Sequence, residues 1–238
     1  MSGRPVLIIH SVLVGLTPLI PVPLLDDAVK HYIERRMVRA IGEAHDLELS
    51  KQDVGELVDD VDGSLLGSIA MGVITFPVKL IFRKLFVVLE VKRASDEASR
   101  AYHRGYLLDR ALSSQLMRPG GRHSPKQIRA ALDAATDDGS VSPVGSVMRA
   151  VFQSSKDIVE SAGKSLISKL RGKSGKVSEE AISAAVDDTA SKGPVATIAE
   201  RLQAALGELP ADHFRELEQR FDRAVSSTLL ETVVTEPR

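Results

Sequence analysis

The chain has 238 residues, of which 43% are apolar and 26% are charged, a balance typical of a globular protein. It contains no cysteine, which excludes disulfides, thiolate metal sites and cysteine nucleophiles, and an aromatic share of 4% argues against recognition by stacking on aromatic faces. The net charge of −1 conceals two opposite regions: residues 119–176 carry 10 basic and 5 acidic side chains, whereas residues 177–238 carry 6 and 12.

The first feature along the chain is an uncharged stretch from Pro5 to Leu25. About 20 apolar residues in a helix would cross a bilayer, but Pro18, Pro21 and Pro23 interrupt this one. A continuous helix is therefore predicted only to about Thr17, which is too short to span as one straight helix. The stretch lacks a small-residue cleavage site, so we expect it to be retained rather than removed as a secretory signal.

Two amphipathic helices are predicted next. Asp26 and Asp27 complement the dipole at the start of the first helix, and apolar residues then recur every three or four positions, at Val29, Tyr32, Ile33, Met37, Val38 and Ile41. In the second helix Ser50 and Asp53 form a capping pattern ahead of the apolar positions Val54, Leu57, Val58 and Val61.

The stretch "LLGSIAMGVITFPVKLIFRKLFVVLEVKR" combines an uncharged run with a basic one. Residues 63–78 carry no charge, and Pro77 would kink or restart a helix there. The basic residues then fall on one helical face, which predicts a hydrophobic arm over Leu65 to Phe76 and a basic amphipathic arm after it. The residues expected at a membrane surface are Lys79, Arg83, Lys84, Lys92 and Arg93.

The rest of the chain also shows only helical patterns. A polar helix is expected to continue to about residue 116, and the segment from Pro119 to Pro125 is the clearest break. Further helices are predicted over 125–136, 143–171, 179–191, 194–206 and from about 211 onward. The predicted fold is all-α, with helical hairpins packed into a bundle, a hydrophobic N-terminal half (1–118) and a charged C-terminal helical region (124–238).

One polar cluster invites a chemical interpretation: Arg100, His103, Arg104 and Asp109 lie close together in "RAYHRGYLLDR". His103 and Asp109 could support acid–base work, but no nucleophile is singled out, and the simpler interpretation is an exposed, salt-bridged helix end. No catalytic residue, metal site or cofactor is predicted, because phosphate-binding and zinc-binding spacings are missing. The basic residues of 156–176 could bind phosphates weakly, yet nucleic acid is not expected as a partner.

Two segments carry a resemblance. The stretch from Leu19 to Leu49, "LIPVPLLDDAVKHYIERRMVRAIGEAHDLEL", is similar to bacterial helical proteins in which a Pro-x-Pro turn and an acidic residue precede an amphipathic helix, including YcjF-type membrane proteins. "FPVKLIFRKLFVVLEVKRASDEASRAYHRGYLLDRAL" resembles helical proteins of soil bacteria. The resemblance covers about the first 115 residues, implies a membrane-associated helical protein and carries no active site to transfer. Any link to a GTPase would come from a partner.

Three hypotheses follow. The first is a non-enzymatic scaffold or interaction protein at the cytoplasmic face of the inner membrane, with Val6 to Leu16 and Leu65 to Phe76 as its hydrophobic elements. The second is a soluble helical bundle for protein interaction or self-association, with both apolar runs buried. The third is a helical enzyme with a site near His103 and Asp109. The sequence does not identify a small-molecule ligand under any of them.

Overall fold

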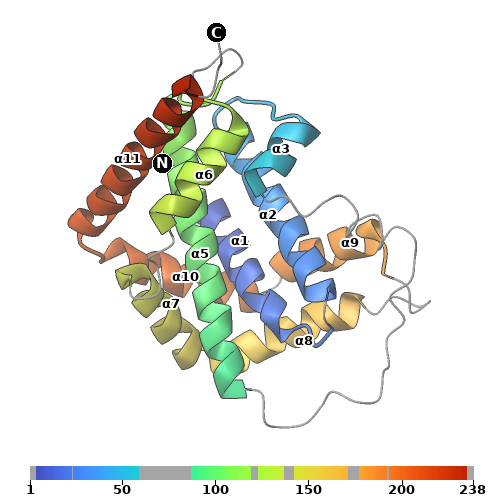
Figure 1. The fold of residues 1–238 in the computed structure, drawn as a ribbon. Coiled ribbons are helices and arrows are strands. Elements are labelled where there is room, and N and C mark those ends of the chain that lie inside the picture. Colours follow the sequence, from blue (N-terminus) through green and yellow to red (C-terminus); the bar gives the residue numbers. More distant parts are fainter. Residues whose placement is uncertain are drawn as a thin grey trace.

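The computed structural model describes residues 4–22, 24–58, 87–118, 123–136, 142–170, 177–191 and 193–234, and every regular element in these ranges is helical (Figure 1). The all-α bundle predicted from sequence is therefore confirmed. The elements are α1 (Arg4–Leu16), η1 (Thr17–Leu19), α2 (Leu25–Ala44), α3 (Lys51–Val58), α5 (Val87–Ser113), α6 (Pro125–Thr136), α7 (Pro143–Ser154), α8 (Lys156–Leu170), α9 (Glu179–Ala190), α10 (Gly193–Gly207) and α11 (Ala211–Val234).

Helix α1 lies at the centre of the bundle. Val12, Leu13, Val14 and Leu16 are fully buried, and helices α2, α5 and α10 pack around them. A helix that is hydrophobic on all sides is stable in water only when other elements surround it. The apolar surface of residues 6–16 is thus used for packing inside the protein, which favours the hypothesis that this run is a core helix.

The closest helix pairing is between α1 and α5, and two glycines of these helices make it possible. A Cβ added to Gly15 would lie 2.8 Å from the Ala94 carbonyl oxygen and 2.9 Å from the Ala98 Cβ. A Cβ added to Gly105 would lie 2.2 Å from Leu7 Cδ1. At Gly15 the nearest atom is backbone, so a side chain there would require the two helices to move apart, whereas at Gly105 the nearest atom is the end of the Leu7 side chain, which can rotate away.

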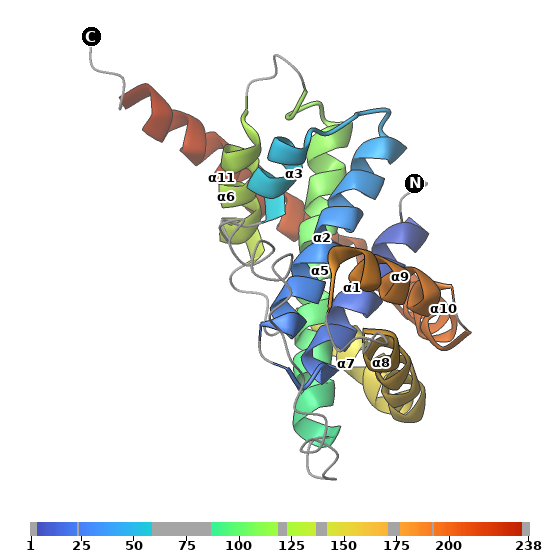
Figure 2. The ribbon, with the colours of Figure 1, turned by 90° about the vertical axis from the view of Figure 1, so that its right-hand side faces the viewer.

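The remaining helices lie on two sides of this central pair (Figure 2). Helices α7, α8, α9 and α10 lie on one side, where α7 packs on α5 and α10 packs on α1. Helices α3, α6 and α11 lie on the other side, where α11 packs mainly on α6. The division into 1–118 and 124–238 stays a prediction, although helices of both ranges contact the central pair.

The helix starts follow the predicted caps. The Asp53 N–H donates to Ser50 Oγ at 3.1 Å, and the Ser50 N–H donates back to Asp53 Oδ2 at 3.0 Å, which is a reciprocal capping box. Ser124 and Gln127 repeat this arrangement at the start of α6. Ser178 accepts from the Ala181 N–H and starts α9.

The single helix predicted over residues 143–171 is wrong, because the chain breaks at Ser155 into α7 and α8. The Ser155 carbonyl accepts from the N–H groups of Ile158 and Val159, so it starts a new helix, and its hydroxyl accepts from Arg201 at 2.7 Å. No glycine or proline marks this junction, and the distant Arg201 helps to fix it. A local sequence pattern could not reveal the break.

The prolines after α1 end it as expected. The chain leaves α1 through the 3₁₀ turn η1 and reaches α2 through Leu24, which has a positive φ of 71°. In the part of the chain that the structure describes, no helix combines the length and apolar character needed to cross a bilayer. The hydrophobic arm of Leu65 to Phe76 and Val61 lie outside the described residues.

Candidate functional site

The predicted polar cluster is divided between different faces of α5. His103 and Asp109 are six positions apart on one helix, which places them about 120° apart around its axis. His103 faces His213 of α11, whereas Asp109 lies 2.8 Å from Nε2 of His45, at the end of α2. An acid–base pair of His103 and Asp109 is therefore not assembled.

His103 is a buried residue, so the interpretation of this region as an exposed helix end is wrong for it. Its side chain is 3% exposed, and its ring lies edge-on to His213 with 5.7 Å between the ring centroids. Burial lowers the pKa of His103 to about 4, and the neighbouring His213 and Arg220 act in the same direction. His103 is accordingly a neutral imidazole at pH 7.

The surroundings of this histidine pair are closed. Ser99 Oγ lies 3.5 Å from His103 Nδ1, but both side chains are buried, and a substrate cannot reach them. Burial also lowers the pKa of His213, which packs edge-on against Phe214. Two neutral, enclosed imidazoles are suited to packing between α5 and α11 rather than to proton transfer with a substrate.

The two arginines of the cluster have different roles. Arg100 is 61% exposed at its side chain and lies 3.5 Å from Glu97, so it is a surface group. Arg104 lies 3.2 Å from Asp133 of α6 and reaches the wall of a pocket on the other side of α5. Arg100 and Arg104 are close in sequence, but they contact different partners, Glu97 and Asp133.

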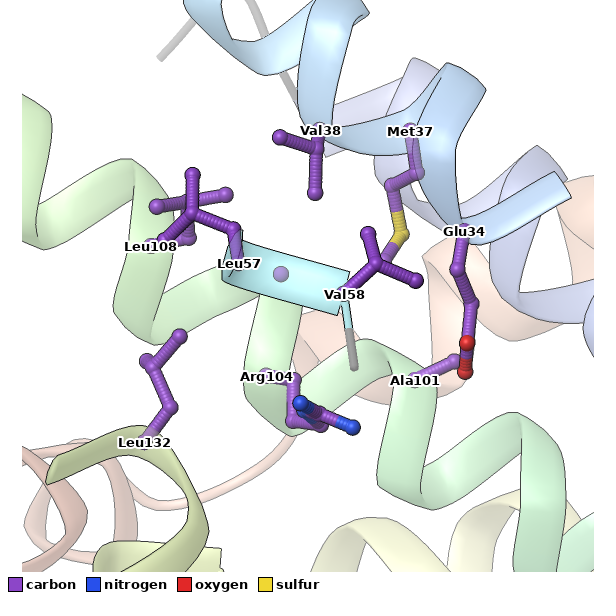
Figure 3. A pocket seen from close by; sticks show the side chains of 10 residues that line it. Glu34, Met37, Val38, Leu57, Val58, Ala101, Arg104, Leu108 and Leu132 are labelled. Carbon is purple, nitrogen blue, oxygen red and sulfur yellow. The ribbon is translucent and has the colours of Figure 1, made fainter. Parts of the chain in front are cut away.

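That pocket lies between α2, α3, α5 and α6 (Figure 3). The volume that the centre of a water molecule can occupy in it is about 20 Å³. This volume holds one or two waters and is far smaller than a cofactor needs. Glu34 and Arg104 bring charge to one side of it, and the other walls are apolar or small: Met37, Val38, Leu57, Val58, Ala101, Gly105, Leu108 and Leu132.

A second interface of α5 is formed by charged and polar groups that the sequence did not reveal. The Tyr106 hydroxyl donates to Glu218 Oε1 at 2.6 Å, and Arg110 lies 3.0 Å from Glu218 and 2.8 Å from Asp222. These contacts join residues more than 100 positions apart, so no local pattern could predict them. They connect α11 to the bundle core.

The basic residues expected at a membrane surface fall into two groups. Lys79, Arg83 and Lys84 lie outside the described residues. Lys92 and Arg93 are exposed at the start of α5, and neither forms an ion pair with another residue in the described ranges. Burial raises the pKa of the Asp26 carboxyl and the charge of Arg93 partly opposes this, so Arg93 lies near the start of α2.

Within these ranges the structure holds no group of three or more histidines, aspartates or glutamates that could bind a metal ion. The chain matches no known protein-family model, and it shows no significant similarity to a curated protein or to a solved structure.

Proposed function

We propose that this protein is a non-enzymatic helical scaffold that binds the anionic cytoplasmic face of a bacterial inner membrane. The observation that carries the proposal is the pair of exposed bases at the start of α5. Lys92 and Arg93 are both exposed, with Arg93 near the Asp26 carboxyl, and they directly continue the basic run in the sequence. Residues 79–93 together contain five basic residues and one acidic residue.

The energetic argument rests on charge. A basic side chain close to an anionic leaflet contributes about 1 kcal/mol to binding, so five bases suffice for peripheral attachment at physiological salt. Because most of α1 is enclosed by other helices, the hydrophobic part of the interaction is assigned to Leu65 to Phe76 rather than to α1. The bundle would then present its other helices to protein partners in the cytoplasm.

Co-sedimentation of the full chain with vesicles tests this function. We expect binding to vesicles that contain phosphatidylserine, weaker binding as salt rises, and little binding to pure phosphatidylcholine. The double variant Lys92→Gln/Arg93→Gln should bind roughly 30-fold more weakly, from about 1 kcal/mol for each lost charge.

The matched control removes two exposed bases from another part of the surface. Arg39 and Lys51, at the end of α2 and the start of α3, are also exposed and form no ion pair within the described residues. Arg39→Gln/Lys51→Gln should retain the affinity of the wild type. Equal losses in the two double variants would show a diffuse charge effect, and absence of wild-type binding would refute the membrane function.

Self-association is a second candidate function, and the length of α11 favours it. This helix has 24 residues, about 36 Å, whereas α6, on which it packs, has 12 residues, about 18 Å. Figure 2 shows the C-terminal part of α11 extending beyond the other helices. The part of α11 that extends beyond α6 is a suitable attachment point for a second chain.

Light scattering on the full chain and on a chain ending at Ser227 tests this candidate. If α11 mediates self-association, the full chain forms a dimer or larger species that dissociates on dilution, and the shortened chain is a monomer. A monomer at all concentrations for the full chain would rule the candidate out.

A further inference from the structure

The turn between η1 and α2 holds an apolar side chain in an unusual position. Leu24 is 56% exposed, and its backbone has the left-handed φ of 71°. Among the described residues only Leu24 and Val6, at 37%, are large hydrophobic side chains in the exposed class. The exposure of Leu24 is therefore a local exception among the large apolar residues that the structure describes.

The backbone conformation of Leu24 is unusual as well. A non-glycine residue in the left-handed region is strained, and asparagine or glycine would occupy it with less strain. Leu24 also forms no side-chain cap for α2. The exposed Leu24 side chain is therefore available for contact with a partner.

The neighbours of Leu24 belong to the same end of the molecule as the exposed bases. Helix η1 packs on α5, and Arg93 acts on the carboxyl group of Asp26, two residues after Leu24. Figures 1 and 2 both place the start of α2 and the start of α5 at one end of the bundle. Leu24, Lys92 and Arg93 therefore belong to elements that begin at the same end of the bundle, which we call the basal end.

Two acidic residues also belong to the basal end. Asp26 is half-buried and Asp27 is exposed, and both lie in the first turn of α2, where the positive end of the helix dipole offsets part of their charge. The start of α5 does not offset the positive charge of Lys92 and Arg93, although Arg93 interacts with the Asp26 carboxyl. An apolar side chain at the same end of the bundle as two exposed bases matches the boundary between headgroups and acyl chains.

We propose that the basal end binds an anionic phospholipid bilayer, with Leu24 inserted below the headgroups while Lys92 and Arg93 contact the lipid phosphates. This inference rests on the proposed membrane function and adds the orientation of the protein and the residue that enters the lipid. Val6 lies at the opposite end of α1 and remains in water in the same orientation.

The absence of cysteine in the wild-type chain allows the orientation to be tested by a single label. Leu24→Cys and Val6→Cys are each coupled to an environment-sensitive fluorophore and mixed with phosphatidylserine vesicles. We expect a blue shift for the label at position 24 and none for the label at position 6. Co-sedimentation of both labelled proteins without a shift at position 24 would overturn the inference and leave the membrane function intact.

A second variant separates lipid insertion from folding. Leu24→Asn introduces a residue that readily adopts the left-handed backbone conformation. The stability of this variant to urea should therefore equal or exceed that of the wild type. Its affinity for phosphatidylserine vesicles should nevertheless fall roughly fivefold, because the inserted side chain is lost. Unchanged affinity would contradict insertion at Leu24, whereas failure of the wild type to bind any vesicle would refute both proposals.

Discussion

Helix α5 makes two very different contacts. Its face toward α1 is dry and closely packed, with Gly15 and Gly105 allowing the two backbones to approach. Its contact with α11 is formed by a tyrosine, an arginine, two carboxylates and a pair of histidines. The first contact depends on shape and the second on charge and protonation, so they should respond to different perturbations.

The comparison also explains how an apolar run can be mistaken for a membrane element. Helix α1 is largely apolar, but protein covers most of it from Leu7 onward, with Ile9 and His10 partly exposed. A high hydropathy indicates that a helix is excluded from water, but it does not indicate whether protein or lipid surrounds the helix. In this bundle the surrounding amphipathic helices cover most of α1.

The largest effect is expected from adding bulk to the dry contact. Gly15→Val should destabilise the protein by about 3 kcal/mol, because the new side chain meets the Ala94 carbonyl and the ring of Phe152, neither of which can move freely. Urea unfolding followed by circular dichroism measures the change.

The control for this variant is Gly55→Ala in α3, where an added Cβ meets no atom within 4 Å. Alanine there should stabilise the protein by roughly 0.5–1 kcal/mol through its helix propensity. Equal stability of Gly15→Val and the wild type would show that α1 and α5 are not in close contact.

Lowering the pH should destabilise the contact between α5 and α11 through His103. Because burial lowers its pKa to about 4, from an ordinary value of 6.5, the unfolded chain binds a proton first as the pH falls. The stability contributed by neutral His103 is complete above pH 6.5 and is lost as the pH falls to about 4, by roughly 3 kcal/mol in total.

Urea unfolding of wild type and His103→Gln at a series of pH values from 7 to 4 checks this expectation. The variant should be less stable at pH 7 and should show a shallower decline, since the titrating group is gone. A parallel decline in both proteins would assign the acid sensitivity to other residues, such as His213 and His10, whose pKa values burial also lowers.

A smaller effect is expected at Arg110. The variant Arg110→Gln removes the ion pairs to Glu218 and Asp222, which are partly exposed, and should cost about 1 kcal/mol at low salt. The difference from the wild type should shrink in 1 M salt, where such pairs are screened. A loss that does not depend on salt would mean that Arg110 acts by packing rather than by charge.

The local features of the fold were accessible from the sequence. Serine caps, proline breaks and three-and-four apolar spacing predicted the starts of α3, α6 and α9 and the buried face of α2, because these signals act within a few residues. The break at Ser155 was missed, since its partner Arg201 is 46 positions away.

The candidate site was predicted less well for the same reason. Sequence proximity suggested that His103 and Asp109 act together, but their actual partners are His213 and His45, contributed by distant helices. Burial of His103 could not be predicted either, because the neighbouring arginines made the segment look exposed. Lys92 and Arg93 are exposed, and their expected place at a membrane surface stays a prediction.

Hydrogen exchange of the full chain, with and without phosphatidylserine vesicles, tests the central claim that α1 is a core helix and that the basal end is the membrane-binding surface. The amides of α1 should exchange among the slowest in the protein without vesicles and should not change when vesicles are added, while the start of α2 gains protection. Rapid exchange of α1 in water, followed by strong protection on adding vesicles, would show that α1 inserts into lipid and would contradict this account.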